Sequence, residues 1–188
     1  MTLALLQRRA LLLQAAAAGG LGAGAAAAAP ASASAPTPPP GRPGDFDFLT
    51  GEWRIHNRRP KAEGGFDEFP GEATVIRLLD GAASIEELRI PAKGFSGLGL
   101  RFFDPKAQLW RDIWMNAKHG IAEGPGMPGH FIDGAGIFEA DDKDGETPIK
   151  VRGIWDQITP RSCRWRQGVS RDGGRTWTFN WWMDWVRA

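Results

Sequence analysis

From residue 51 onward, apolar and polar residues alternate with a period of two, and turn-forming residues interrupt this alternation at short intervals. A period of two places successive side chains on opposite faces of a β-strand. Asp80-Gly81, Asp104-Pro105 and Asp172-Gly173-Gly174 are strong turn signals between such runs. No segment keeps a helical period, and only 46–49 is expected to form one short helical turn. The sequence therefore predicts an all-β fold.

About ten strands joined by tight links are typical of an antiparallel up-and-down β-barrel or of a sandwich. We predict a single closed barrel, because closure removes the exposed edges that so many strands would leave. The strands are expected at 52–59, 71–79, 83–90, 97–103, 108–116, 130–132, 135–140, 148–157, 162–169 and 175–186. One face of the last strand, expected to point inward, carries Trp177, Phe179, Trp181, Met183 and Trp185.

Residues 1–33 have the order of an export signal. Arg8 and Arg9 form a charged start. An Ala/Gly/Leu run follows over 10–29, and Ala31-Ser32-Ala33 then supplies the small residues that a signal peptidase recognises. Because leucines follow the arginine pair, the segment resembles a twin-arginine signal, so we expect a periplasmic or secreted protein. An uncleaved membrane anchor is the alternative.

Cleavage after Ala33 would leave 155 residues and change the formal net charge from +1 to −1. A charge so near zero requires neither nucleic acid nor, after cleavage, a membrane as a partner, and we expect neither. The Pro-rich stretch 34–44 is predicted to be a flexible linker, and 45–188 to be the barrel domain. Cys163, the only cysteine, forms no intrachain disulfide and is expected to be a packed thiol or a lone surface thiol.

Residues 46–53 read Phe-Asp-Phe-Leu-Thr-Gly-Glu-Trp, and 170–177 read Ser-Arg-Asp-Gly-Gly-Arg-Thr-Trp. With further stretches between 45 and 187, they resemble the uncharacterised bacterial DUF1579 family. Its members open with Phe-Asp-Phe-Leu-x-Gly-x-Trp, which matches Phe46 to Trp53. Residues 100–105 and 151–160 match the middle of the family, and 170–187 is similar to its ending. The Gly-x-Trp core also resembles the first strand of lipocalin-like (calycin) barrels.

The resemblance implies a lipocalin-like barrel with an interior, and it implies little about activity. In such barrels a late arginine lies across the first-strand tryptophan and closes one end. Arg187 and Trp53 are the matching positions here. Phe46 and Phe48 are expected to plug the same end.

Ser170 to Trp177 fits the Asp-box pattern Ser-x-Asp-x-Gly-x-Thr-Trp, which is familiar from sialidases. The Asp172 carboxylate is expected to accept backbone amides across a hairpin turn, with Trp177 packed beneath. Sialidases carry the box on several propeller blades, whereas it occurs once here, so we assign it to hairpin structure.

Charged residues inside the strand runs define the candidate ligand site, because a closed barrel must pair or solvate any charge that points inward. Most such charges are expected on solvated outer faces. For those that point inward, the polar anchors would be Glu87, Arg101, Asp112 and Arg152, and the walls would be Trp110, Trp114 and Trp155. This mixture suits a small hydrophobic or aromatic molecule with one polar end.

We therefore predict an exported barrel that binds such a molecule without chemistry and without a cofactor. An enzyme of the same fold, with Asp112 or Glu87 as general acid or base, is one alternative. A haem-binding barrel resembling nitrobindin, with His119 or His130 as axial ligand, is another. The histidine spacing predicts no preformed metal site, and the sequence carries no signal for an oligomeric state.

Overall fold

The structure of the protein, a computed structural model, describes residues 39–116, 120 and 125–188. The predicted export signal, 1–33, and the first part of the predicted linker, 34–38, lie outside the described residues. The elements in chain order are η1 (Asp47–Leu49), β1 (Gly51–Pro60), β2 (Phe66–Leu78), η2 (Leu79–Gly81), β3 (Ala83–Ile90), η3 (Pro91–Lys93), β4 (Phe95–Asp104), β5 (Leu109–Asn116), β6 (Met127–Ile132), β7 (Ala135–Asp144), β8 (Thr147–Asp156), β9 (Ser162–Ser170) and β10 (Thr178–Arg187).

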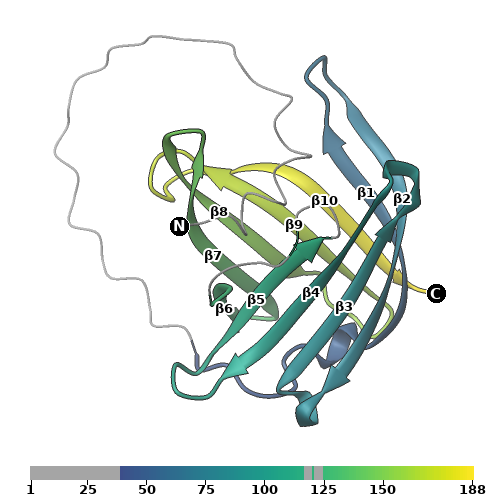
Figure 1. The fold of residues 1–188 in the computed structure, drawn as a ribbon, viewed down its shortest axis with the longest axis vertical. Coiled ribbons are helices and arrows are strands. Elements are labelled where there is room, and N and C mark those ends of the chain that lie inside the picture. Colours follow the sequence, from purple (N-terminus) through teal and green to yellow (C-terminus); the bar gives the residue numbers. More distant parts are fainter. Residues whose placement is uncertain (1–38, 117–119, 121–124) are drawn as a thin grey trace, which may run out of the picture.

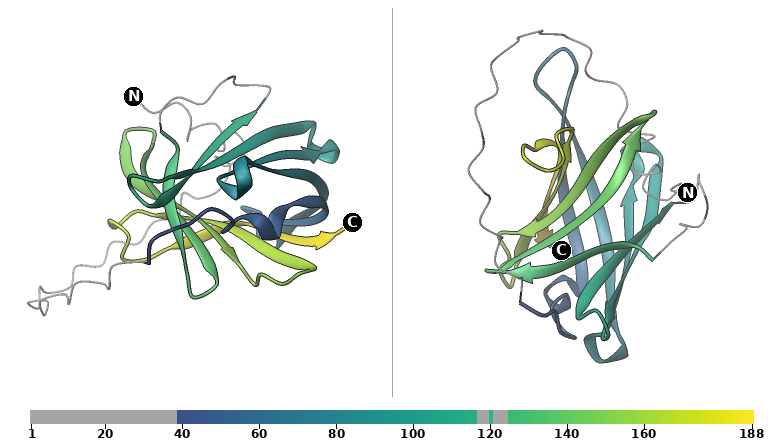
Figure 2. Two further views of the ribbon diagram at one scale, coloured as in Figure 1. Left: turned by 90° about the horizontal axis from the view of Figure 1, so that it is seen from below. Right: turned by 90° about the vertical axis from the view of Figure 1, so that its left-hand side faces the viewer.

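The ten strands form one closed antiparallel barrel, in which each strand pairs with its neighbours in the sequence (Figure 1). β10 returns to pair with β1, in a register that runs from Trp53 opposite Arg187 to Arg58 opposite Trp182. Seen end-on in the left view of Figure 2, the strands form a ring, and η1 lies across the near end. The predicted all-β, up-and-down barrel is confirmed.

Two strands begin at least three residues earlier than the sequence predicts. β2 begins at Phe66 rather than at 71, because β1 provides an antiparallel partner for each residue from Phe66 to Val75. Pro70, within this stretch, is exposed and lies in the ladder opposite His56. β6 similarly begins at Met127 rather than at 130.

Within the described residues, the pairing of β5 with β6 is the shortest in the barrel. It joins Trp110–Asp112 to Met127–Gly129. β1, by contrast, is paired with β2 along its whole length, Gly51–Pro60. In the described part of the chain, the seam between β5 and β6 therefore has the fewest paired residues.

A plug of aromatic side chains fills the barrel end at η1. The ring of Phe46 lies edge-on to Trp110 and to Phe131, at centroid distances of 4.9 and 5.0 Å. Phe48 packs against the rings of Phe131 and Trp155. Edge-to-face pairs of this kind add to the stabilisation that burial of the rings provides, so this end is closed as expected.

Arg187 completes the closure over the first strand. Its guanidinium carbon lies 4.0 Å from the ring centroid of Trp53, and its Nη2 donates to the Phe48 carbonyl at 2.7 Å. Nη1 donates to the carbonyl of Thr50. The guanidinium therefore ties the end of β10 to the η1 segment, and its predicted stacking on Trp53 is present.

The inward face of β10 differs from the prediction in its first half. Trp181, Met183 and Trp185 are buried and point into the barrel. A β-bulge between Phe179 and Trp181 shifts the alternation by one residue. Phe179 consequently packs on the outside against Arg166 and Trp182, so its predicted inward orientation, and that of Trp177, is wrong.

The last residues of the predicted linker contact the barrel. Gly41 is buried, and its amide donates to the Gln108 carbonyl at 2.8 Å. The Gly44 amide likewise donates to the carbonyl of Gly81 at 2.9 Å. The contacts of the domain therefore begin at Gly41, four residues before the boundary that composition predicts.

The Asp-box forms the hairpin between β9 and β10 as expected. Asp172 accepts hydrogen bonds from the backbone amides of Arg175 and Thr176, at 3.0 and 2.9 Å, and from the Thr176 hydroxyl. Trp177 lies on the outside of the barrel, with the Arg152 guanidinium 3.9 Å from its ring centroid. The box is a structural turn in this protein.

The hairpin makes the contribution of Asp172 to stability dependent on pH. Donation by the Thr176 amide and hydroxyl, and then by Ser170, holds the pKa of Asp172 well below its usual range. Because this pKa is depressed in the folded state, the stabilisation is complete above the unfolded value near 3.8 and falls as the pH drops below it. We expect Asp172→Ala to lower the melting temperature at pH 7 and the difference from wild type to shrink below about pH 4. A difference that is constant from pH 7 to pH 2 would contradict this assignment.

Candidate functional site

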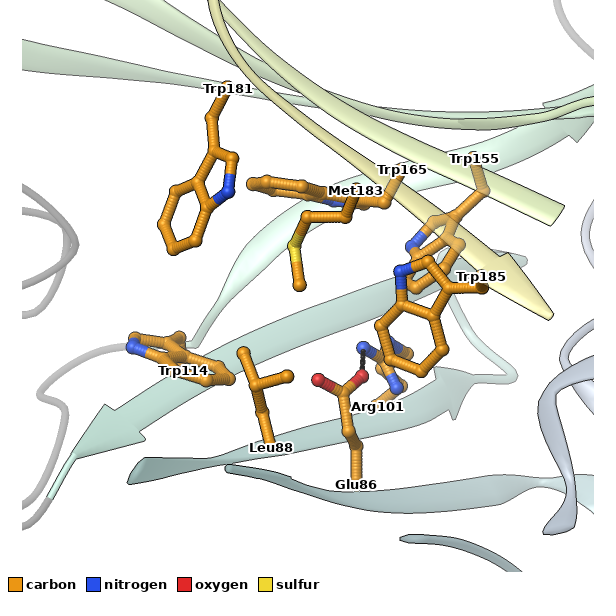
Figure 3. Close-up of a pocket in the computed structure, with 9 residues that line it drawn as sticks. All are labelled: Glu86, Leu88, Arg101, Trp114, Trp155, Trp165, Trp181, Met183 and Trp185. Atoms are coloured by element: carbon orange, nitrogen blue, oxygen red, sulfur yellow. Dashed lines mark hydrogen bonds and ion pairs between the residues drawn. The ribbon is translucent and has the colours of Figure 1, made fainter. Parts of the chain in front are cut away.

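The candidate site is a cavity inside the barrel, between the aromatic plug and the opposite end (Figure 3). The space in it that is open to the centre of a water molecule is about 20 Å³, and its total empty space, which includes open solvent, is about 310 Å³. Its lining combines five tryptophans with two apolar side chains and one ion pair. These residues are Glu86, Leu88, Arg101, Trp114, Trp155, Trp165, Trp181, Met183 and Trp185.

Strands on opposite sides of the barrel supply this lining. Leu88 and Glu86 come from β3, while Trp155 comes from β8 and Trp165 from β9. Trp155 and Trp165 are direct cross-strand partners. Only closure of the barrel brings the β3 face opposite this pair, so the site is a product of the whole fold.

Glycine on β4 makes room for one wall. A Cβ atom at position 97 would lie 2.3 Å from Cζ2 of Trp114, so glycine is needed there for the indole to lie across the strand. Phe95 stacks on the same indole, with the ring planes 14° apart. Trp114 is thereby fixed between its own strand and β4.

Glu86 and Arg101 form the polar floor of the cavity, and Asp112 lies next to Arg101 without lining the cavity. Arg101 Nη2 donates to Glu86 Oε2, and Arg101 Nε lies 3.8 Å from Asp112 Oδ1. All three side chains are at most 3% exposed. The guanidinium also lies 5.2 Å from the ring centroids of Phe46 and Trp155. Arg101 therefore joins the aromatic plug to the polar floor of the cavity.

Arg101 stays charged in this setting. Burial alone would lower its pKa, but the carboxylates of Glu86 and Asp112 outweigh burial, so the pKa of Arg101 is raised above its ordinary value. A buried guanidinium with two carboxyl groups gives the cavity floor a fixed orientation of charge. The floor is therefore polar, whereas the walls are aromatic.

Unpaired hydrogen-bond donors face this floor. Within the described residues, the Nε1–H groups of Trp155 and Trp185 have no acceptor, and neither does Nη1 of Arg101. The two indoles contact each other edge-on at a centroid distance of 5.3 Å, and Figure 3 shows both nitrogen atoms on the cavity side. Trp181 differs, because its Nε1 donates to Asn57 Oδ1 at 3.0 Å. Buried donors of this kind favour a ligand that brings an acceptor.

The structure brings four of the seven predicted ligand-site residues into or next to the cavity. Arg101, Trp114 and Trp155 line it, and Asp112 lies directly behind Arg101. Trp110 is fully buried, but it belongs to the plug, where its Nε1 donates to Asp45 Oδ2 at 3.1 Å.

Glu87 and Arg152, the other two predicted anchors, are on the outer face, so their predicted inward placement is wrong. Glu87 is exposed and pairs with Arg89 at 2.7 Å. Arg152 Nε donates to Glu139 at 2.7 Å on the outside of β7 and β8. Both side chains keep their charge in contact with water, which costs less than burying it.

Glu86 is the important residue that the sequence reasoning missed. It shares a strand face with Leu88 and Ile90, whereas Glu87 shares the other face with Ile85 and Arg89. The two faces carry equal numbers of apolar residues, Leu88 and Ile90 against Ala83 and Ile85, so a count of apolar residues does not identify Glu86 as the inward carboxylate. Of the two carboxylates proposed for general acid or base chemistry, only Asp112 points inward.

Cys163 is a packed thiol. It is 3% exposed, and burial, followed by the nearby Glu86 carboxylate, raises its pKa to about 12. A thiol with such a pKa is protonated at neutral pH and is a poor nucleophile. Of the two roles that the sequence leaves open, a packed thiol and a lone surface thiol, the structure shows the packed one.

Of the two histidines weighed as haem ligands, the structure describes only His130, which does not line the cavity. His119 lies outside the described residues. His130 is on the outer face of β6, where burial lowers its pKa although Glu139 opposes the shift. Across the described part of the chain, no three His, Cys, Asp or Glu side chains are grouped as metal ligands would be.

Comparison with known proteins gives no family or relative for this chain: no family model matches it, and no curated protein matches it. The search for membrane spans, made over the described residues, finds no helix with the length and apolar character to cross a bilayer.

Proposed function

We propose that this protein binds a small, largely apolar molecule inside its barrel and holds it without chemical change. The observation that carries the proposal is a cavity with five indole walls, inside a closed barrel that is plugged at the η1 end. Aromatic walls with a few convergent polar groups are typical of small-molecule sites. The ligand would be a small hydrophobic or aromatic molecule with its polar end at Arg101 and Glu86.

The proposed setting is the periplasm or the cell exterior. The support for export is the order of residues in 1–33, from the Arg8-Arg9 pair to Ala31-Ser32-Ala33. We also propose membership of the DUF1579 family, on the strength of the matches at Phe46 to Trp53 and at 170–187.

Two measurements test the binding proposal. Native mass spectrometry of the full chain, purified from the producing cells, should show a co-purified small mass. Titration with toluene, followed by the methyl resonance of Met183, should show saturable binding in the cavity. Leu88→Phe, which fills the cavity from β3, should weaken toluene binding at least about tenfold, since the ring takes the space of the ligand.

Ile85→Phe is the matched control, because Ile85 lies on the same strand with its side chain on the opposite face. It should leave toluene affinity unchanged. Equal loss in both variants, or a chain that carries no small mass and does not bind toluene, would refute the proposal.

A further inference from the structure

The polar end of the cavity is rich in donors. Three side chains bring unpaired N–H groups to it within the described residues: Trp155, Trp185 and Arg101. Trp155 and Trp185 are 2% and 1% exposed, so bulk water does not satisfy their indoles. A buried donor without an acceptor is costly, and a ligand oxygen placed here would remove that cost.

One acceptor faces the same space. Oε2 of Glu86 accepts from Arg101, while the other carboxylate oxygen, Oε1, is on the cavity side in Figure 3. The group that best matches this arrangement both accepts and donates. A hydroxyl does so: its oxygen has two lone pairs, and its hydrogen can be donated to a carboxylate.

Neither of the two ionic alternatives matches the site. A ligand carboxylate would become a third acid beside Glu86 and Asp112, against the single guanidinium of Arg101. The net negative charge of these three groups would attract an ammonium, but an ammonium has no lone pair and would offer no acceptor to the two indoles. The ligand end is therefore neutral.

Size limits what enters. The space open to the centre of a water molecule, about 20 Å³, holds about one such molecule, which is the size of a hydroxyl. We place the body of the ligand against Trp114, Trp165 and Trp181, where Met183 lies across the cavity (Figure 3). Met183 is a flexible side chain that can move aside for a flat ring.

We propose that the cavity selects small neutral molecules with a hydroxyl on an aromatic or other apolar body, as in phenols. The hydroxyl oxygen accepts from Nε1–H of Trp155 and Trp185, and its hydrogen is donated to Oε1 of Glu86. This inference rests on the proposed function, since it assigns the ligand class of the same cavity. On this proposal, Trp155 and Trp185 line the cavity with their rings and also determine its specificity through their Nε1–H groups.

Three probes of similar size test the inference on the full chain, at a pH where phenol is neutral. Phenol both accepts and donates, anisole only accepts, and toluene does neither. Titrations followed by the ¹⁵N–¹H signals of the indoles should give affinities in the order phenol, anisole, toluene. Phenol should bind at least about tenfold more tightly than toluene, because it gains two or more hydrogen bonds in a buried site.

Conservative variants separate the hydrogen bonds from the packing. Trp155→Phe and Trp185→Phe keep an aromatic ring but remove the N–H, and each should reduce the phenol-to-toluene preference about three- to tenfold. Trp182→Phe is the matched control, since Trp182 lies on the outer face of β10, against Phe66 and Phe179; it should leave the preference unchanged.

The outcomes distinguish this inference from the proposed function. Equal affinity for phenol and toluene, or an equal effect of all three variants, would overturn the hydroxyl inference while the apolar cavity stands. Absence of binding by all three probes would overturn both.

Discussion

Replacing Arg101 by methionine should destabilise the barrel more than any other charge change in the molecule. Arg101 is 1% exposed and is the counter-charge for Glu86 and Asp112, which are equally buried. Methionine preserves the length and the apolar contacts of the side chain, but it leaves the two buried carboxyl groups without the positive charge of the guanidinium. Breaking a buried ion pair on one side costs about 3–5 kcal/mol, and we expect a loss of that size in the free energy of unfolding. Urea denaturation at neutral pH measures it.

Arg164→Met provides the matched control. Arg164 forms an ion pair with Asp184 on the outer face, where its side chain is 27% exposed, so its loss should cost less than about 1 kcal/mol. Adding Glu86→Gln to Arg101→Met should recover part of the lost stability, because one unpaired carboxyl group becomes neutral. Equal losses in the free energy of unfolding for Arg101→Met and Arg164→Met would show that the buried charged group stabilises the fold no more than a surface ion pair does.

Trp53→Ala is expected to have the second large effect. Trp53 is 1% exposed, its Nε1 donates to the Leu49 carbonyl at 2.6 Å, and its ring meets Trp185 edge-on at 5.8 Å. Truncation removes these contacts together with the surface on which Arg187 stacks. A buried tryptophan replaced by alanine typically costs about 3–5 kcal/mol, and we expect a value in that range from urea or thermal unfolding.

Trp182→Ala separates this local role from the general loss of an indole. Trp182 lies on the outer face of β10, partly exposed, against Phe66 and Phe179. Its truncation should cost less than half as much as that of Trp53. If the two losses are equal, the closure of the barrel by Trp53 and Arg187 is not a special source of stability.

The fold was predictable from the sequence because a period of two and frequent turn signals are local properties. Strand alternation also shows which residues share a face, as for Arg101 and Asp112, which are cross-strand partners inside the barrel. It does not show which of two faces points inward where both carry charge. On β3 the acidic neighbours Glu86 and Glu87 lie on opposite faces. Glu87 was predicted to be the cavity residue, and Glu87 is the one that points outward.

The cavity was less predictable, because its walls come from strands far apart in the sequence. Trp165 and Trp185 meet Glu86 only after β10 has closed on β1. The bulge after Phe179 had no signal in the alternation, since an aromatic residue suits either side of a strand. The stacking of Arg187 on Trp53 at the closed end of the barrel, by contrast, could be predicted from the resemblance to lipocalin-like barrels.

The short pairing between β5 and β6 gives the ring of strands a preferred breaking point. A closed barrel has no edges, but parting the Trp110–Asp112 pairing from Met127–Gly129 would turn it into an open sheet with two new edges. Local opening proceeds where the fewest hydrogen bonds must be broken, so this seam should set the rate at which amides deep in the barrel exchange with solvent. Trp114 lies on β5 just past that pairing. The residence time of a bound molecule would then depend on how often the seam opens, independently of how well the cavity fits it.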